Sequence, residues 1–416
     1  MNAAAQTTQE TTRGGHVRVP HSVRFVTIAV VLSAATLLIG AQTPRRPGDR
    51  QPARLRQPRI MPLPEAQWTE VHRNLANKYS RADNGFRTLL NVPQVVDGVM
   101  PFTIYLSEAS TLAPRHRELL ILRTTWLCGS QALWPAHAAR ARAAGMTKDE
   151  IHGVAEGPDA AGWTGIERTL LQLADELYRN SSVTDRTWRD LASTYDEHHL
   201  MDAVETVNHF TFLSLLYNSF GVQPDAGATD RLPSGVRYRV VVPQREPPLT
   251  VARVSPMDGT GIAVGRTFAR HPKLNEARTL RAGFVNRLSP LVPRHREMLI
   301  LRSGWNCQSE YEWAQHVGRV GRARDHGLDP MRIAEGPDRP GWDPFEATLL
   351  RAADELYRDA TVSDATWNAL AARFDTASLM SAVFTASSYR ATSMSLNTYG
   401  VQLEPGDERF PRVGSQ

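Results

Sequence analysis

The chain has 416 residues, which is enough for two domains with ordinary cores. Hydrophobic residues make up 41% and charged residues 22% of the sequence, as in soluble globular proteins. The formal net charge is +5 at pH 7, and much of it comes from arginines near the N-terminus. Beyond that region no Lys/Arg-dense run is interleaved with aromatic residues, so the sequence does not indicate a nucleic-acid partner.

Residues 1–58 are predicted to lie outside the folded domains. Residues 1–24 are polar and basic, and residues 25–41 form an uncharged apolar run that ends in small residues, as in a secretory signal peptide. The run is shorter than the about 20 apolar residues of a spanning helix, so a membrane anchor is the second interpretation. We therefore expect an exported or membrane-anchored protein, or a cytoplasmic one if translation starts near Met61. Residues 44–58 are rich in Pro and Arg and are expected to form a disordered linker.

From residue 59 onward the sequence repeats itself at a spacing of 179 positions. The stretch RHRELLILRTTWLCGSQALWPAH at 115–137 returns as RHREMLILRSGWNCQSEYEWAQH at 294–316. The register is kept at the two EGPD motifs further along the chain. A repeat of this length is a whole domain rather than a short solenoid unit.

We predict a first domain at 59–223, a linker at 224–256 and a second domain at 257–416. The linker is rich in Pro and Gly, and its β-branched run at 236–242 predicts one short strand. Within each domain apolar residues recur at three- and four-residue spacing, as at 167–179, which is typical of helices. No segment of either domain alternates like a sheet strand. The predicted fold class is all-α, with two tandem helical domains packed as a pseudo-dimer.

The strongest candidate site lies in the second repeat. Glu312 and His316 are four residues apart, which on a helix places both side chains on one face. A carboxylate that contacts an imidazole can fix its tautomer and raise its pKa, as acid–base chemistry near neutral pH requires. The alternative for Glu312 is a capping box with Ser309. Glu297 leads an apolar helix and needs a charged partner if it is buried.

Three further residue types in the repeats, Arg, Cys and Trp, have both a functional and a structural interpretation. Arg296 and Arg302 could bind a substrate carboxylate or pair with a glutamate of the chain. Cys307 precedes a predicted helix start, where the helix dipole favours thiolate; an inert buried cysteine is the alternative. A disulfide between Cys128 and Cys307 is conceivable in an exported protein. Trp313 is expected to form part of the core or of a pocket wall.

The first repeat departs from this pattern. It keeps Glu118 and His137, but Leu133 stands four residues before His137, where the second repeat has a glutamate. Pro135 removes a backbone donor and constrains the start of the helix. We predict that the first domain is a scaffold and that any catalytic site lies in the second.

The stretch REMLILRSGWNCQSEYEWAQH, followed by AEGP and ADELY, resembles the carboxymuconolactone decarboxylase family, which includes the AhpD-like alkylhydroperoxidases. The resemblance covers roughly residues 90–223 and 269–402. It implies an all-helical fold, assembly into homo-oligomers, a small-molecule substrate, and catalysis without a metal or organic cofactor. It also implies that His316 is the family histidine and Glu297 the upstream glutamate.

The hydroperoxidase branch has a Cys-x-x-Cys pair, whose two positions fall on Ser309 and Glu312 in this chain. The redox pair is therefore absent, and Glu312 before His316 is similar to the decarboxylase branch. A single thiolate could still reduce a peroxide if another thiol resolved it.

Three functional hypotheses follow. In the first, His316 is oriented by a glutamate and protonates the carbon of a small carboxylate or lactone that loses carbon dioxide, while Arg302 or Arg296 holds the developing charge. This is a cofactor-independent lyase of the carboxymuconolactone decarboxylase class. The second hypothesis is an AhpD-like peroxidase that acts through Cys307. The third is a non-catalytic helical assembly or ligand-binding protein.

Overall fold

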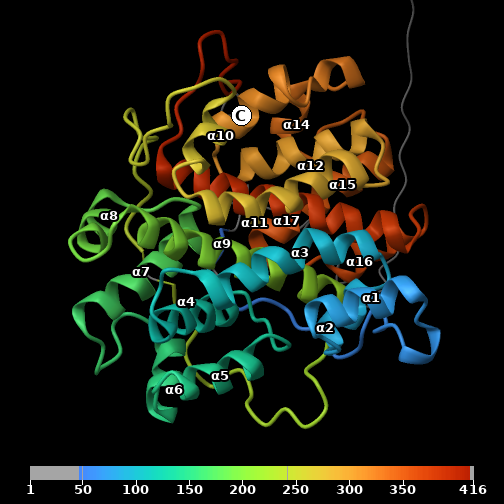
Figure 1. The fold of residues 1–416 in the computed structure, drawn as a ribbon. Coiled ribbons are helices and arrows are strands. Elements are labelled where there is room, and N and C mark those ends of the chain that lie inside the picture. Colours follow the sequence, from blue (N-terminus) through green and yellow to red (C-terminus); the bar gives the residue numbers. More distant parts are fainter. Residues whose placement is uncertain (1–45, 49, 241, 413–416) are drawn as a thin grey trace, which may run out of the picture. The chain divides into compact units, whose positions relative to one another are not determined.

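The computed structural model describes residues 46–48, 50–240 and 242–412, and this part of the chain contains helices and no strands (Figure 1). The prediction of an all-α fold is confirmed. The predicted export or anchor segment, residues 25–41, lies outside the described residues. Among the helices that are described, none has the length and apolar character needed to cross a lipid bilayer.

Residues 59–223 are called the first half. A 3-10 turn, Glu65–Gln67, precedes its first α-helix, and α3 continues into a π-helical turn, Tyr105–Ala109. The α-helices of this half are α1 (Glu70–Tyr79), α2 (Asn84–Leu89), α3 (Pro93–Ile104), α4 (Pro114–Leu127), α5 (Trp134–Ala143), α6 (Lys148–Glu156), α7 (Gly165–Asn180), α8 (Asp185–Ala192) and α9 (Glu197–Phe220).

Residues 257–416 are called the second half. Its α11 also continues into a π-helical turn, Phe284–Leu288, and a 3-10 turn, Ala323–His326, precedes α14. The α-helices are α10 (Ala263–Phe268), α11 (Pro272–Gly283), α12 (Pro293–Asn306), α13 (Glu310–Ala314), α14 (Pro330–Glu335), α15 (Pro344–Asp359), α16 (Asp364–Ala371) and α17 (Thr376–Tyr399).

Helix boundaries recur between the halves at the spacing of 179 positions. Both ends shift by this amount in the pairs α2/α10, α3/α11, α4/α12, α7/α15, α8/α16 and α9/α17. α6 and α14 share only their C-terminal end, and no helix stands at the positions equivalent to α1. α5 is a regular helix of 10 residues, and its counterpart is the short α13 followed by a π-helical turn, Gln315–Arg319. The candidate histidines lie in these two unlike elements.

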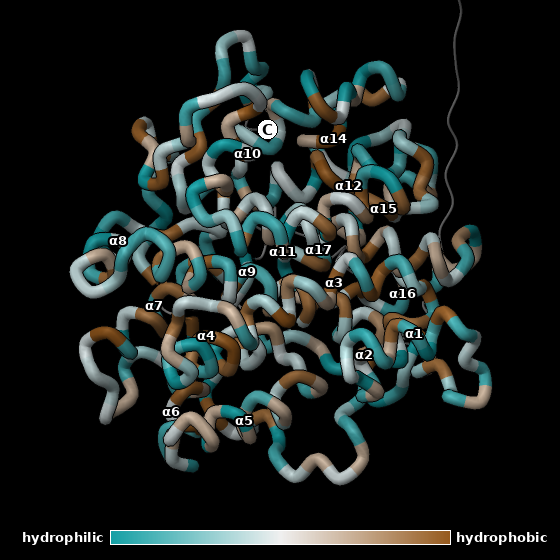
Figure 2. The backbone as a smooth tube through the Cα atoms, viewed as in Figure 1, coloured by the Kyte–Doolittle hydropathy of each residue, from teal (hydrophilic) through white to brown (hydrophobic). Residues whose placement is uncertain are grey.

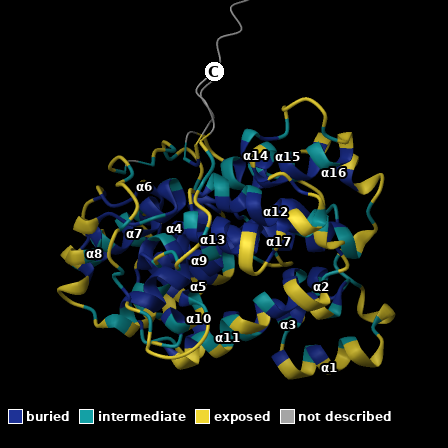
Figure 3. Cartoon of the chain, turned by 90° about the horizontal axis from the view of Figure 1, so that it is seen from above, coloured by how far each residue is buried: buried dark blue, intermediate teal, exposed yellow. Residues whose placement is uncertain are grey.

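The long helices α9 and α17 pack along each other, and α3 packs on α11, so the two halves meet through equivalent elements (Figure 1). The buried faces of α12 and α17 contrast with the exposed residues of α1 (Figure 3). Hydrophobic stretches run through helices such as α12, while the connecting segments are mostly hydrophilic (Figure 2). α9 and α17 end at Gly221 and Gly400, whose φ angles of 72° and 69° suit a left-handed helix cap.

Contacts between the halves are reciprocal. Arg59 pairs with Asp364 at the start of α16 at 2.6 Å, and Arg253 pairs with Asp185 at the start of α8 at 2.5 Å. Arg59 of the first half lies over Trp367 of the second, and Arg253, just before the second half, lies over Trp188 of the first. Reciprocal contacts of this kind are typical of a twofold dimer interface, here within one chain. The predicted domain boundaries and the assembly of this chain into homo-oligomers stay predictions.

Two connecting segments differ from their predicted structure. The expected disordered linker lies against the folded body in its described part: Arg50 pairs with Asp359 at 2.8 Å, and Pro52 is buried beside Gly129. The expected strand at 236–242 is irregular wherever it is described, and Tyr238 instead stacks on a tryptophan of α4. Isolated β-branched residues form a strand only where a neighbouring strand completes the hydrogen-bond ladder. Arg50 and Pro52 are ordered by contacts with residues far away in the sequence, and the composition of the segment alone does not predict such contacts.

Candidate functional site

Three charged side chains meet in the core of the second half. Nδ1 of His316 lies 2.7 Å from Oε2 of Glu297, and Nε2 lies 3.0 Å from Oε1 of Glu312. None of the three side chains is more than 7% exposed. Both ring nitrogens therefore face a carboxylate oxygen, and an imidazolium can donate a hydrogen bond to each.

These residues come from three consecutive elements. Glu297 lies on the buried face of α12, Glu312 on α13, and His316 on the π-helical turn that continues α13. The structure thus brings Glu312 and His316 together as their spacing suggests. The capping-box interpretation is wrong, because the hydroxyl of Ser309 makes no hydrogen bond in the structure and the Glu312 carboxylate is turned toward the imidazole.

The buried carboxylates determine the protonation of the imidazole. Burial by itself would lower the pKa of His316, but the charge and hydrogen bond of Glu297, and then those of Glu312, raise it to about 10. Burial would likewise raise the pKa of Glu297, yet the charge of His316 and then that of Arg296 lower it. At neutral pH the ring is an imidazolium between carboxylates, which makes it a proton donor rather than a base.

Of the two predicted substrate-binding arginines, the structure brings one to the site. Nε of Arg296 lies 3.3 Å from Oε1 of Glu297. Arg302 instead forms a two-pronged ion pair with Asp354, at 2.5 and 2.9 Å, and donates to two carbonyls at the end of α14. The substrate-binding role predicted for Arg302 is therefore corrected: its guanidinium joins α12 to α14 and α15.

Trp313 lies in the core. Its side chain is fully buried in a cluster with Met298 and Leu301, and its ring packs at an angle to the rings of Trp305 and Phe410. The structure therefore favours the core interpretation for this residue over a pocket wall.

The cysteines do not have the environment of a reactive thiol. Cys307 is fully buried at the C-terminal cap of α12, and its carbonyl accepts a hydrogen bond from Asn397 at 2.9 Å. Burial raises the pKa of the Cys307 thiol and raises that of Cys128 to about 12. Both thiols are free. Of the two interpretations of Cys307, the structure favours the inert buried cysteine over the thiolate.

We expect neither thiol to react with a water-soluble chromogenic disulfide reagent while the protein is folded, because both thiols are buried and protonated. Both should react fully in denaturant. Absorbance of the released thiolate measures this, with the Cys128→Ser and Cys307→Ser variants assigning each reaction. Rapid reaction of one thiol in the native protein would restore Cys307 as a candidate nucleophile.

Two residues that the sequence analysis did not single out border the site. The ring of Tyr389 stands perpendicular to that of His316, with centroids 4.9 Å apart. Gly321 backs the ion pair so closely that a Cβ there would lie 2.7 Å from Nδ1 of His316 and would also meet Oε2 of Glu297. Comparing the repeats could have found Tyr389, since the equivalent residue is Phe210. Nothing in the sequence marks Gly321.

The first half keeps the buried pair of a glutamate and a histidine, but its surroundings are apolar. Nδ1 of His137 lies 2.7 Å from Oε2 of Glu118, and the ring of Phe210 stands edge-on to the imidazole at 4.8 Å. Leu133 occupies the position of Glu312, so no second carboxylate faces the ring. A cavity of about 250 Å³ adjoins His137.

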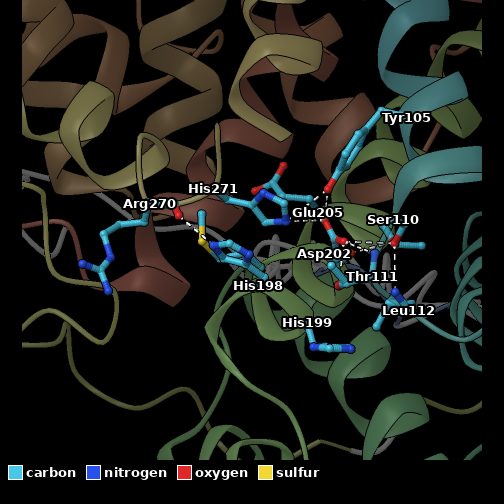
Figure 4. Close-up of polar contacts among 12 residues, drawn as sticks. Tyr105, Ser110, Thr111, Leu112, His198, His199, Asp202, Glu205, Arg270 and His271 are labelled. Atoms are coloured by element: carbon cyan, nitrogen blue, oxygen red, sulfur yellow. Dashed lines mark hydrogen bonds and ion pairs between the residues drawn. The ribbon is translucent and has the colours of Figure 1, made fainter. Parts of the chain in front are cut away.

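A separate polar cluster joins the halves (Figure 4). Asp202 accepts hydrogen bonds from Tyr105 at 2.7 Å and from the backbone of Thr111 at 2.6 Å, and its carboxylate lies 3.4 Å from Nε2 of His271. Burial alone would raise the pKa of Asp202, but these partners lower it. The polar atoms of Asp202 are thus satisfied within the protein, and the cluster links α9 to the π-helical turn after α3 and to the N-terminal cap of α11. Throughout residues 46–48, 50–240 and 242–412, no group of three or more His, Cys, Asp or Glu residues is arranged to hold a metal ion.

Residues 93–176, which contain the Glu118–His137 pair, match the family model described as "Carboxymuconolactone decarboxylase family". This part of the chain is similar to that family. The match confirms the resemblance for the first half, where the sequence motif is less complete. No curated protein matches the chain.

Solved structures with a similar arrangement include the debrominase Bmp8, in its apo form and as a C82A variant in complex with 2,3,4-tribromopyrrole. Both are 14% identical, have a TM-score of 0.34 and match 40% of this chain and 91–92% of theirs. An uncharacterized peroxidase-related protein from Silicibacter sp. TM1040 is also 14% identical, with a TM-score of 0.36 over 44% of this chain and 97% of its own.

Proposed function

We propose that the Glu297–His316–Glu312 site transfers a proton in a cofactor-independent enzyme of the carboxymuconolactone decarboxylase class, acting on a small carboxylate or lactone. The observation that carries this proposal is the buried imidazole held by two carboxylates. Burying such charges costs free energy relative to apolar residues of similar size, and perturbed pKa values of this kind gather at functional sites. Leu133 in the first half indicates that the fold itself does not require the second carboxylate.

The proposed reaction uses His316 as a general acid. The carbon–carbon bond to the substrate carboxylate breaks, carbon dioxide leaves, and the electron pair is delocalised into the neighbouring carbonyl. Nε2–H of His316 then protonates the carbon, after Glu312 has released its hydrogen bond to that nitrogen. Glu297 holds Nδ1–H throughout and keeps the ring in its orientation. A water proton restores the imidazolium.

Two guanidinium groups near the site favour a negatively charged substrate. Arg296 borders the site through Glu297. Arg278 on α11 makes no hydrogen bond or ion pair with any described residue, and its Nε is buried without a partner. Burial lowers the pKa of Arg278, while the nearby carboxylates of Glu205 and Glu312 act in the opposite direction.

The position of Arg278 in the repeat is one that, in the first half, faces a cavity. Its equivalent in the first half is Val99, which lines the cavity beside His137. The guanidinium of Arg278 lies over the ring of Phe268, 3.5 Å from its centroid, and it has no carboxylate partner of its own. An arginine in that position, close to Glu312, is suited to bind a substrate carboxylate.

The test is release of carbon dioxide from carboxymuconolactone and a panel of small lactone carboxylates by the full-length chain. We expect His316→Gln to reduce kcat by about a hundredfold or more, the usual contribution of a general acid. His137→Gln in the first half is the matched control and should keep turnover. An active His316→Gln variant, or a wild-type protein that turns over none of the panel, would contradict the proposal.

A further inference from the structure

The cavity beside His137 is a second site with different chemistry. Its volume is about 250 Å³, and side chains such as Val99, Met100, Leu133 and Phe210 form an apolar wall. An apolar cavity of about 150 Å³ already holds one benzene ring. The cavity in the first half therefore has room for a one-ring molecule, and its walls favour an apolar one.

The cavity is open to solvent at a polar edge. Arg140 and Asp225 line it and are exposed, so a small molecule can enter from this side. Arg140 makes no hydrogen bond or ion pair within the described chain. The lining comes from α2, α3, α5 and α9, from the segments just before α2 and α5, and from the segment that follows α9.

His137 supplies a hydrogen-bonding group inside this apolar space. Its Nδ1 is engaged by Glu118, while Nε2 has no hydrogen-bond partner among the described residues. In the second half the equivalent nitrogen is taken by Glu312, and Tyr389 adds a hydroxyl where Phe210 stands here. A neutral imidazole that donates Nδ1–H to a carboxylate presents Nε2 as an acceptor.

We propose that the first half binds a small aromatic molecule carrying one hydrogen-bond donor, of the phenol type. The ring would lie against Val99, Leu133 and Phe210, and the hydroxyl would donate to Nε2 of His137. The site is independent of the acid–base chemistry proposed for His316. The first half then acts as a ligand-binding domain, in addition to the scaffold predicted from sequence.

The test is calorimetric titration of the full-length protein with phenol, and with toluene as the analogue that lacks the donor. We expect saturable binding of phenol, about fivefold tighter than toluene, which corresponds to one hydrogen bond of ordinary net strength. Leu133→Glu should abolish both, because it places a carboxylate against Nε2 as in the second half. Ala139→Glu adds the same charge to an exposed position of α5 outside the cavity and should leave binding unchanged.

A second variant tests the role of the histidine by removing it together with its buried carboxylate. His137→Phe combined with Glu118→Leu removes both partners, a replacement that can be nearly neutral for stability. In this protein phenol should bind no more tightly than toluene. No saturable binding of phenol to wild type, equal binding by Leu133→Glu, or a preference for phenol that survives in the double variant would each overturn the proposal. None of these outcomes bears on turnover at His316.

Discussion

Gly321→Ala is expected to destabilise the folded protein by about 3 kcal/mol, from overpacking and from disruption of a buried ion pair. A Cβ at this position would lie 2.6 Å from the backbone oxygen of His316 and 2.7 Å from its Nδ1, and it would also meet Oε2 of Glu297. Neither partner can retreat easily, because both side chains are buried and each holds the other. The added methyl group must therefore separate the imidazole from its carboxylate.

The measurement is the free energy of unfolding in urea, with Gly318→Ala as the matched control. Gly318 lies three residues before Gly321, in the π-helical turn, and is exposed, and a Cβ there meets nothing within 4 Å. The control should change stability by less than about 0.5 kcal/mol. Equal stability of the two variants would mean that Glu297 and His316 are not held as tightly as the structure indicates.

Glu297→Gln is expected to have the second large effect, a loss of about 3–5 kcal/mol of stability near pH 6, because it leaves a buried imidazolium without its principal partner. The same change should lower the pKa of His316 from its value of about 10, since the charge of Glu297 is the main cause of the upward shift. Nitrogen chemical shifts of the imidazole, followed against pH, report both protonation states.

The pH dependence has a definite sign. The pKa of His316 is raised above 6.5 in the folded protein, so its stabilising contribution is complete below pH 6.5 and is lost as the pH rises through about 10. The pKa of Glu297 is lowered from 4.5, so its contribution is complete above pH 4.5 and is lost as the pH falls through the lowered value. The difference between wild type and Glu297→Gln should therefore be largest between pH 4.5 and 6.5.

A control for this variant is available on the neighbouring helix. Glu310 pairs with the exposed Arg409 at 2.9 Å, and surface pairs contribute about 0–1 kcal/mol. Glu310→Gln should therefore shift stability little and should leave the pKa of His316 in place. A Glu297→Gln protein with an unchanged imidazole titration would rule out the charge of Glu297 as the source of the upward pKa shift.

The same buried glutamate–histidine pair stands in a different environment in each half. Both keep a glutamate on Nδ1 at 2.7 Å. Where the first half has Leu133 and Phe210 against an apolar cavity, the second half has Glu312 and Tyr389 around a charged site, and the helix that carries the histidine changes from α5 to α13 with its π-helical turn. The family match to residues 93–176 lies in the half with the apolar wall.

The sequence alone determined the features that depend on local spacing. Apolar residues at three- and four-residue intervals predict helices, and the repeat predicts that the helices occur twice. The four-residue separation of Glu312 and His316 predicts that they can meet, because adjacent helical turns fix that distance whatever surrounds them.

Tertiary structure decided which partner each charged group takes and which residues are buried. Glu297 reaches His316 across 19 residues, and Arg302 reaches Asp354 across 52, so neither choice follows from helical periodicity. The thiol of Cys307 stays protonated because distant helices exclude water from it. The cavity beside His137 exists because side chains from separate helices leave space between them, which depends on how they pack and on no single segment of the chain.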